Sequence, residues 1–102
     1  MRTFQVETVA QTEFEEAAAF YEGKRDGLGL EFVDEVQRVL LRISQRPSFP
    51  TAPIAQVEGG VIRREFVDRF PYVVVFVETD ELRKVIMIRR GSSSPARWRS
   101  RI

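Results

Sequence analysis

The sequence predicts an α+β fold in which a two-helix antiparallel hairpin packs on a small, mainly antiparallel sheet. Three observations lead to this expectation. Apolar residues recur at helical spacing in the first half of the chain, short β-branched runs separated by turn residues fill the second half, and an alternating segment precedes the helices. Packing the hairpin on one face of the sheet is the economical way to bury these apolar surfaces. The 102 residues fit one domain, residues 1–102.

The N-terminal segment predicts a strand followed by a helix. Residues 3–7 alternate polar and apolar side chains, which is typical of a half-buried strand. Thr12 and Glu15 fit a capping box, so we expect the first helix to begin there and to run to about Lys24. Its buried stripe comprises Phe14, Ala17, Ala18 and Tyr21. The acidic residues expected to face solvent are Glu13, Glu16 and Glu22.

A second helix should complete the hairpin. Three glycines within residues 23–29 predict the turn between the helices. The second helix should run from about Leu30 to Gln45, because Pro47 disfavours a helical residue before it. Its apolar face comprises Phe32, Val33, Val36, Leu40 and Ile43. Three prolines and two glycines within residues 47–60 then predict an irregular surface connection.

Three strands and a short helix are expected in the second half of the chain. The strands are Val61–Val67, Pro71–Glu78 and Arg83–Arg90. The middle strand is apolar on both faces, so it should lie in the centre of the sheet. Ser94 and Pro95 fit the N-cap and the first position of a terminal helix over residues 96–101, which carries Trp98.

Charge is distributed unevenly along the chain. Residues 1–35 carry nine acids and three bases, whereas residues 61–102 carry ten bases and five acids. The last fourteen residues hold five arginines and no acid. A chain with a basic C-terminal half attracts anionic partners to that half, so we expect a macromolecular partner to dock there.

The residue types that are absent restrict the chemistry. The sequence has no His and no Cys, which argues against a structural zinc site and excludes Ser-His and Cys-His nucleophilic pairs. Acid–base catalysis would rest on Asp, Glu, Tyr, Lys or Arg, of which Arg is a poor proton shuttle because its pKa is so high. We therefore expect no metal, no cofactor and no evident catalytic set. The longest apolar run, residues 73–77, is far too short to span a membrane, and residues 1–7 lack a signal-peptide core, so we expect a cytoplasmic protein.

Several segments, taken in order, resemble one family. The first helix is acidic and Ala-rich and ends in residues 20–23, Phe-Tyr-Glu-Gly; the second has an early Phe and is followed by a Pro. The most specific segment is residues 60–66, with its two arginines, followed by the Phe-Pro-Tyr of residues 70–72. The chain then ends with basic residues, Pro95 and Trp98. Together these features resemble the RelE/ParE superfamily of bacterial toxins, in its ParE-like branch, over nearly the whole chain.

The resemblance implies the toxin component of a type II toxin–antitoxin, or plasmid stabilisation, system. A ParE-like toxin binds a target such as DNA gyrase and is neutralised by a cognate antitoxin. An acidic antitoxin segment that wraps the toxin would complement the basic half of this chain.

The region before Pro95 departs from the family pattern, which often has a His and a pair of arginines there. An ungapped match places Arg90 at the His and serines at the arginines, whereas a shifted match places Arg89 and Arg90 at the pair. Two alternatives therefore stay open. One is a RelE-like endonuclease that cleaves mRNA on the ribosome, although such enzymes often use a C-terminal Tyr that this chain lacks. The other is a non-toxic family member that serves as a binding module.

The candidate residues for binding a target or antitoxin lie in the strands and the tail. They are Arg63, Arg64, Arg89, Arg90, Arg97, Trp98 and Arg99. Arg63 and Arg64 are adjacent on a strand and should point to opposite faces, so that one ion-pairs with acids of the first helix and the other faces a partner. Trp98 should pack against the core and fix the tail.

Overall fold

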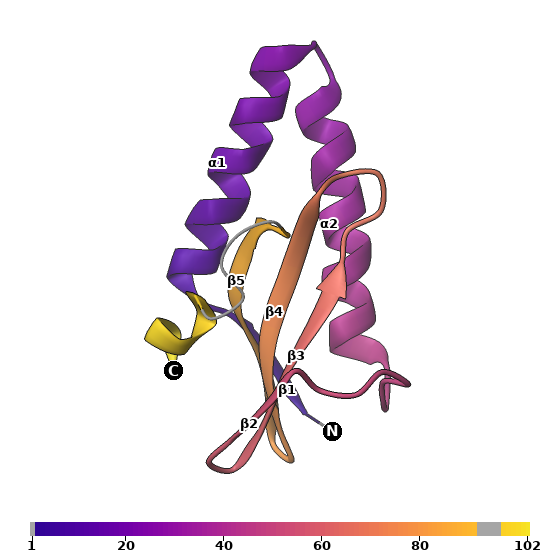
Figure 1. Cartoon of the computed structure of the whole chain (residues 1–102). Helices are drawn as coiled ribbons and strands as arrows, with labels where there is room; N and C mark the ends of the chain where they lie inside the picture. Colours follow the sequence, from indigo (N-terminus) through magenta and orange to yellow (C-terminus); the bar gives the residue numbers. More distant parts are fainter. Residues whose placement is uncertain (1, 92–96) are drawn as a thin grey trace.

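The computed structural model describes residues 2–91 and 97–102. Two helices form a layer on one face of a five-stranded sheet, and a short 3-10 helix, η1, lies at the flank of the sheet (Figure 1). The elements are β1 (Thr3–Val6), α1 (Thr8–Lys24), α2 (Leu28–Gln45), β2 (Ala55–Val57), β3 (Gly60–Phe66), β4 (Tyr72–Thr79), β5 (Leu82–Arg90) and η1 (Arg97–Arg101). The expected α+β fold is confirmed, while the expected Ser94 and Pro95 helix start lies outside the described residues.

The strand order in the sheet is β1-β5-β4-β3-β2. β1 pairs with β5 in parallel, and every other pair of neighbouring strands is antiparallel. The apolar strand β4 occupies the centre, as its sequence predicts. β2 was not expected, because its three residues lie in a Pro- and Gly-rich segment. It forms because Gly59 adopts a positive φ of 81° and so turns the chain back onto β3.

The N-cap of the first helix lies five residues earlier than the capping-box pattern predicts. Glu7 is its N-cap, and Thr12 is already part of the helix, so the expectation of a cap at Thr12 was wrong. The start is set by the sheet instead. The Glu7 N–H donates to the Val85 carbonyl at 2.8 Å, and the Glu7 carbonyl accepts from Gln11 at 2.9 Å. β1 therefore passes into α1 without a linker.

The helical layer covers one face of the sheet, which we call the first face. Aromatic rings from both helices and the sheet meet there: Phe32 lies 5.1 Å from Phe70 and 5.0 Å from Tyr72 between ring centroids. Phe32 and Phe76 are fully buried. Burial of such side chains contributes about 1.5–3 kcal/mol each, so this cluster fixes the position of the hairpin on the sheet.

The second face, opposite the helices, has an apolar cluster of its own. Its buried members are Ile62, Val73, Val75, Ile86, Met87 and Trp98. The pairing of β4 with β5 shifts between Val75 and Phe76, which leaves one extra residue on β5. This β-bulge places Ile86 and Met87 on the same face. Trp98, which is 6% exposed, covers the cluster, as expected for a packed tail anchor.

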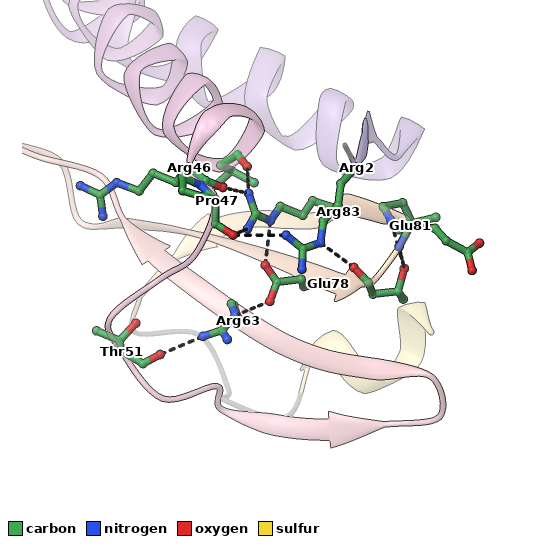
Figure 2. A network of polar contacts seen from close by, with 11 residues as sticks. Arg2, Arg46, Pro47, Thr51, Arg63, Glu78, Glu81 and Arg83 are labelled. Atoms are coloured by element: carbon green, nitrogen blue, oxygen red, sulfur yellow. Dashed lines mark hydrogen bonds and ion pairs between the residues drawn. The ribbon is translucent and has the colours of Figure 1, made fainter.

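A buried ionic network connects the end of α2 to the sheet (Figure 2). Arg83, which is 3% exposed, donates from Nε to Glu78 at 2.7 Å and from Nη1 to the Ile43 carbonyl at 2.9 Å. It also donates to the carbonyls of Arg46 and Pro47. The last carbonyls of a helix have no partner within the helix, so Arg83 caps α2 from inside the protein.

Candidate binding surface on the second face of the sheet

The two faces of the sheet carry different charges. Register places Glu65 and Glu78 on the first face, and these are the only acidic residues in β2 to β5. Each is neutralised there, Glu65 by Arg42 at 2.9 Å and Glu78 by two arginines. The charged residues of β3 to β5 on the second face are all basic: Arg64, Lys84 and Arg89. Lys84 pairs with Glu7 at 3.1 Å and Arg89 lies 3.6 Å from Glu13, whereas Arg64 has no ion pair among the described residues. Arg64 is therefore the second-face base of these strands that is left to attract an anionic group.

Arg63 and Arg64 point to opposite faces, as adjacent strand positions require. Arg63 is on the first face and donates to Glu78 at 2.8 Å and to the Thr51 carbonyl at 2.8 Å. Its partner is thus an acid of the neighbouring strand, and the expectation of a helix-1 acid was wrong. Arg64 is exposed, and its guanidinium carbon lies 5.3 Å from the centre of the Phe66 ring. Arg64 makes no ion pair within the described part of the chain.

Arg89 and Arg90 lie where β5 extends beyond the end of β1. Arg89 is half-buried, with its Nε 3.6 Å from Glu13, while Arg90 is exposed. Both line an open groove of about 410 Å³ between α1 and β5. The other groove residues are Glu13, Glu16, Ala17, Phe20, Tyr72 and Ile88. The Phe20 side chain is half exposed at 50%, so the groove offers an aromatic ring beside two arginines. Such a combination suits an anchor residue of a protein partner.

Glu13 does not face solvent as expected. Its carboxylate accepts from Arg101 at 2.7 and 2.9 Å and from the Ile88 backbone N–H at 3.1 Å. Arg101 also donates to the Ile86 carbonyl at 2.9 Å. The hydrogen bonds to Glu13 raise the pKa of Arg101, although its partial burial acts in the opposite direction. This pair holds η1 against β5.

The tail presents its arginines around a buried tryptophan. Arg97 and Arg99 are exposed, whereas Trp98 packs inward between them. The Arg99 guanidinium carbon lies 5.0 Å from the centre of the Trp98 ring, a cation–π distance. Trp98 is therefore part of the core, and Arg97 and Arg99 are the members of the tail that a partner can reach.

Tyr72 is the tyrosine nearest to Arg89 and Arg90. Burial and the neighbouring Tyr21 raise its pKa, against the effect of the two arginines. The phenol is therefore protonated at neutral pH, as in an ordinary tyrosine. Its ring packs against Tyr21 and Phe32. Tyr72 thus forms a wall of the groove.

Residues 2–91 and 97–102 contain no cluster of three or more acidic side chains that could hold a metal ion. No helix among these residues is long and apolar enough to cross a membrane.

The fold is similar to that of one chain of a solved structure. The chain aligns with a chain of the solved structure "Chromosomal ParDE TA system from P. aeruginosa" at a TM-score of 0.70, over 88% of this chain and 96% of that one. The sequence identity is 16%, so the likeness concerns the fold. No family model matches the sequence, and no curated protein matches it significantly.

The structure divides the seven predicted residues into three groups. Arg63 belongs to the buried network with Glu78, and Trp98 belongs to the core. Arg89 and Arg90 share the groove beside α1. Arg64, Arg97 and Arg99 are exposed. Sequence reasoning missed Phe20 and Phe66, which are 50% and 61% exposed. Each lies beside a basic side chain, and apolar residues exposed next to charge are a signal of a binding surface.

Proposed function

We propose that this protein is the toxin component of a type II toxin–antitoxin system, which binds a cellular target and is neutralised by an antitoxin. The observation that carries the proposal is the likeness in fold, over 96% of the matched chain, to a chain of a ParDE toxin–antitoxin system. The exposed Arg64 on the second face and the groove with Arg89 and Arg90 support a role in binding. DNA gyrase is the target that the ParE-like resemblance implies.

The site residues support binding better than catalysis. The sequence has no His, so the groups in the groove that could transfer a proton are the Tyr72 phenol and the carboxylates. Of those carboxylates, Glu13 is engaged by Arg101. The arginines can contact an acidic protein segment or hold phosphates. Because arginines that hold phosphates could bind RNA, a ribosome-dependent mRNA endonuclease is the alternative function.

The test is to induce the chain alone in bacteria and to follow growth, DNA-damage signalling and translation. Filamentation with DNA-damage signalling would support gyrase poisoning. Immediate arrest of translation with codon-linked mRNA cuts would favour the endonuclease. Normal growth with folded, soluble protein would refute a toxin and leave the binding module. Any toxicity should weaken when Arg89 and Arg90 are both changed to Ala, with the fold intact.

The control for that variant is Arg46→Ala, which removes one positive charge where the double variant removes two. The Arg46 side chain is exposed at the opposite end of the helical layer, and only its backbone carbonyl takes part in the network around Arg83. The Arg46→Ala change therefore removes a positive charge at a residue that does not line the groove of Arg89 and Arg90. Toxicity that falls equally in both variants would indicate an effect of net charge and would contradict a specific role of the groove.

A further inference from the structure

Arg2, which directly precedes β1, is a half-buried arginine without a carboxylate partner within residues 2–91 and 97–102. Its guanidinium contacts backbone oxygens instead. Nε donates to the Thr79 carbonyl at 2.7 Å, and Nη1 donates to the Pro47 carbonyl at 3.3 Å. A guanidinium has five N–H donors, so three donors of Arg2 have no acceptor in the described part of the chain. Arg2 is thus a positive charge that these contacts do not neutralise.

Arg83 brings a second guanidinium to the same place (Figure 2). Its Nη2 donates to the Pro47 carbonyl at 3.2 Å, and this oxygen is the one that Arg2 also contacts. The two Nη atoms therefore lie no further apart than the sum of their distances to that oxygen, 6.5 Å. Three carbonyls and the Glu78 carboxylate engage four of the five Arg83 donors, which leaves one. An anion that bridges the two guanidiniums would offset their mutual repulsion.

A pocket of about 470 Å³ opens beside these two arginines, at the end of α2. Its walls also include Ser44, Gln45, Arg46, Pro47 and Asp80. The Gln45 side-chain amide can donate to an oxyanion. Figure 2 shows the Arg46 guanidinium directed away from Arg83, so Arg2 and Arg83 supply the positive charge beside the Pro47 carbonyl.

The balance of charge at the pocket is positive. Arg63 and Arg83 share one carboxylate, that of Glu78, and Arg2 adds a third guanidinium. Asp80, which is exposed in the turn between β4 and β5, is the acid that lines the pocket. Three arginines thus face two acids. The carbonyls at the end of α2 would repel an anion, but those of Ile43 and Arg46 already accept from Arg83.

We propose that Arg2 and Arg83 form a binding site for a phosphate group at the end of α2. The phosphate bridges the two guanidiniums, because its tetrahedral oxygens accept from both planar forks at once. The site joins the start of β1, the end of α2 and the β4–β5 turn, so its occupation stabilises the contact between α2 and the sheet. It lies apart from the groove of Arg89 and Arg90 and does not depend on the proposed toxin function.

NMR of the arginine side chains in the intact chain tests this proposal directly. The probe is inorganic phosphate at neutral pH, and acetate at equal ionic strength is its control. Phosphate should shift the Nε–H signals of Arg2 and Arg83 in a saturable way, and acetate, with a single charge, should bind at least about fivefold more weakly. Signals of both arginines that stay unchanged at about 50 mM phosphate would overturn the proposal. An equal response to acetate would overturn the assignment to phosphate.

Two arginine variants distinguish the site from a general effect of charge. Arg2→Ala should weaken phosphate binding, measured by calorimetry, about tenfold or more, because it removes charge-assisted hydrogen bonds. Arg38→Ala is the matched control, since Arg38 is 75% exposed on α2 and does not line this pocket, and it should change the affinity by less than about twofold. Equal losses in the two variants would refute the site. If Arg2→Ala does not fold, the titration of the unaltered chain still decides.

The acid of the pocket gives a test with the opposite sign. Asp80→Asn removes a negative charge beside the bound phosphate, so it should strengthen phosphate binding about two- to fivefold. Glu81→Gln is its control, because Glu81 is the next residue, is exposed and does not line the pocket. A gain for Asp80→Asn that is no larger than the gain for Glu81→Gln would show that phosphate does not bind beside the β4–β5 turn.

A second probe identifies the source of the phosphate group. Glycerol 3-phosphate that binds at Arg2 more tightly than inorganic phosphate would assign the site to a phosphorylated small molecule. Equal or weaker binding would assign it to the free ion. A single-stranded oligonucleotide that shifts the Arg2 and Arg83 signals where neither small probe does would assign these arginines to nucleic acid and overturn the proposal.

Discussion

Glu13 and Arg101, 88 residues apart in the sequence, form a two-pronged ion pair at the edge of β5. The pair satisfies backbone groups of β5 that a neighbouring strand would otherwise satisfy. The Glu13 carboxylate accepts from the Ile88 N–H, and the Arg101 guanidinium donates to the Ile86 carbonyl. These contacts explain how a five-residue 3-10 helix with exposed arginines is held on the sheet. They also make the position of the basic tail depend on an acid in the first helix.

Glu13→Gln should destabilise the protein and loosen η1. The amide keeps one acceptor oxygen but loses the negative charge and the second oxygen that accepts from Arg101, so the free energy of unfolding should fall by about 1–3 kcal/mol. Urea titration followed by Trp98 fluorescence measures both effects, because Trp98 lies within η1. Glu16→Gln is the matched control, since Glu16 is exposed on the same helix, and it should stay within about 0.5 kcal/mol of the parent. A loss of the same size in both variants would contradict the role of the pair.

Glu78→Gln should be among the most destabilising single changes at a polar residue. Glu78 lies between the Nε atoms of Arg63 and Arg83 at 2.8 and 2.7 Å, and the Arg83 side chain is only 4% exposed. Loss of the carboxylate leaves a buried charge without its counter-ion, which costs about 3–5 kcal/mol. Chemical unfolding measures the loss. Glu81→Gln serves as the control, because Glu81 is exposed in the next turn. A loss below about 1 kcal/mol for Glu78→Gln would show that the network contributes little.

The same carboxylate predicts how stability depends on pH. Burial opposes ionisation of Glu78, but hydrogen bonds from Arg63 and Arg83 outweigh burial and lower its pKa from the usual value of 4.5. The folded state thus holds the proton less tightly than the unfolded state. The contribution of Glu78 to stability is therefore complete above the unfolded-state pKa and is lost as the pH falls through the folded-state pKa.

Unfolding measured at a series of pH values tests this linkage. The parent protein should lose stability progressively below about pH 4.5, and the Glu78→Gln variant should lose less over the same range. Glu31, whose pKa is also lowered by arginines, titrates in both proteins, so the difference between the two curves isolates Glu78. Parallel curves would contradict the linkage.

Trp98→Ala should open the apolar cluster of the second face. Trp98 is 6% exposed and packs with Ile86 and Met87, so its removal should cost about 3–5 kcal/mol. Trp98→Phe keeps part of the packing and should cost less. Thermal unfolding ranks the three proteins. If Trp98→Ala is as stable as the parent, the ring does not contribute to the core in solution.

The sequence was sufficient for the elements that depend on local pattern. The apolar spacing of the two helices and the β-branched run of β4 predict their type and order, because a period of 3.6 or 2 residues follows from backbone geometry alone. The capping box at Thr12 failed for a tertiary reason: the hydrogen bond from Glu7 to Val85 fixes the helix start at the end of β1. β2 was missed because its three residues pair through a turn that depends on Gly59.

The candidate surface depended more on tertiary structure. The sequence by itself determined the charge imbalance, the absence of His and Cys, and the opposite directions of Arg63 and Arg64. Only the folded chain decided which arginines remain available, because the acids that neutralise Arg63 and Arg101 lie 15 and 88 residues away. The folded chain also decided that β2 pairs with β3 only as far as Ile62, because the length of a strand pair depends on the register between its two strands. The periodicity of a helix or strand depends on neighbouring residues, whereas strand pairing and side-chain exposure arise only when distant segments of the chain meet.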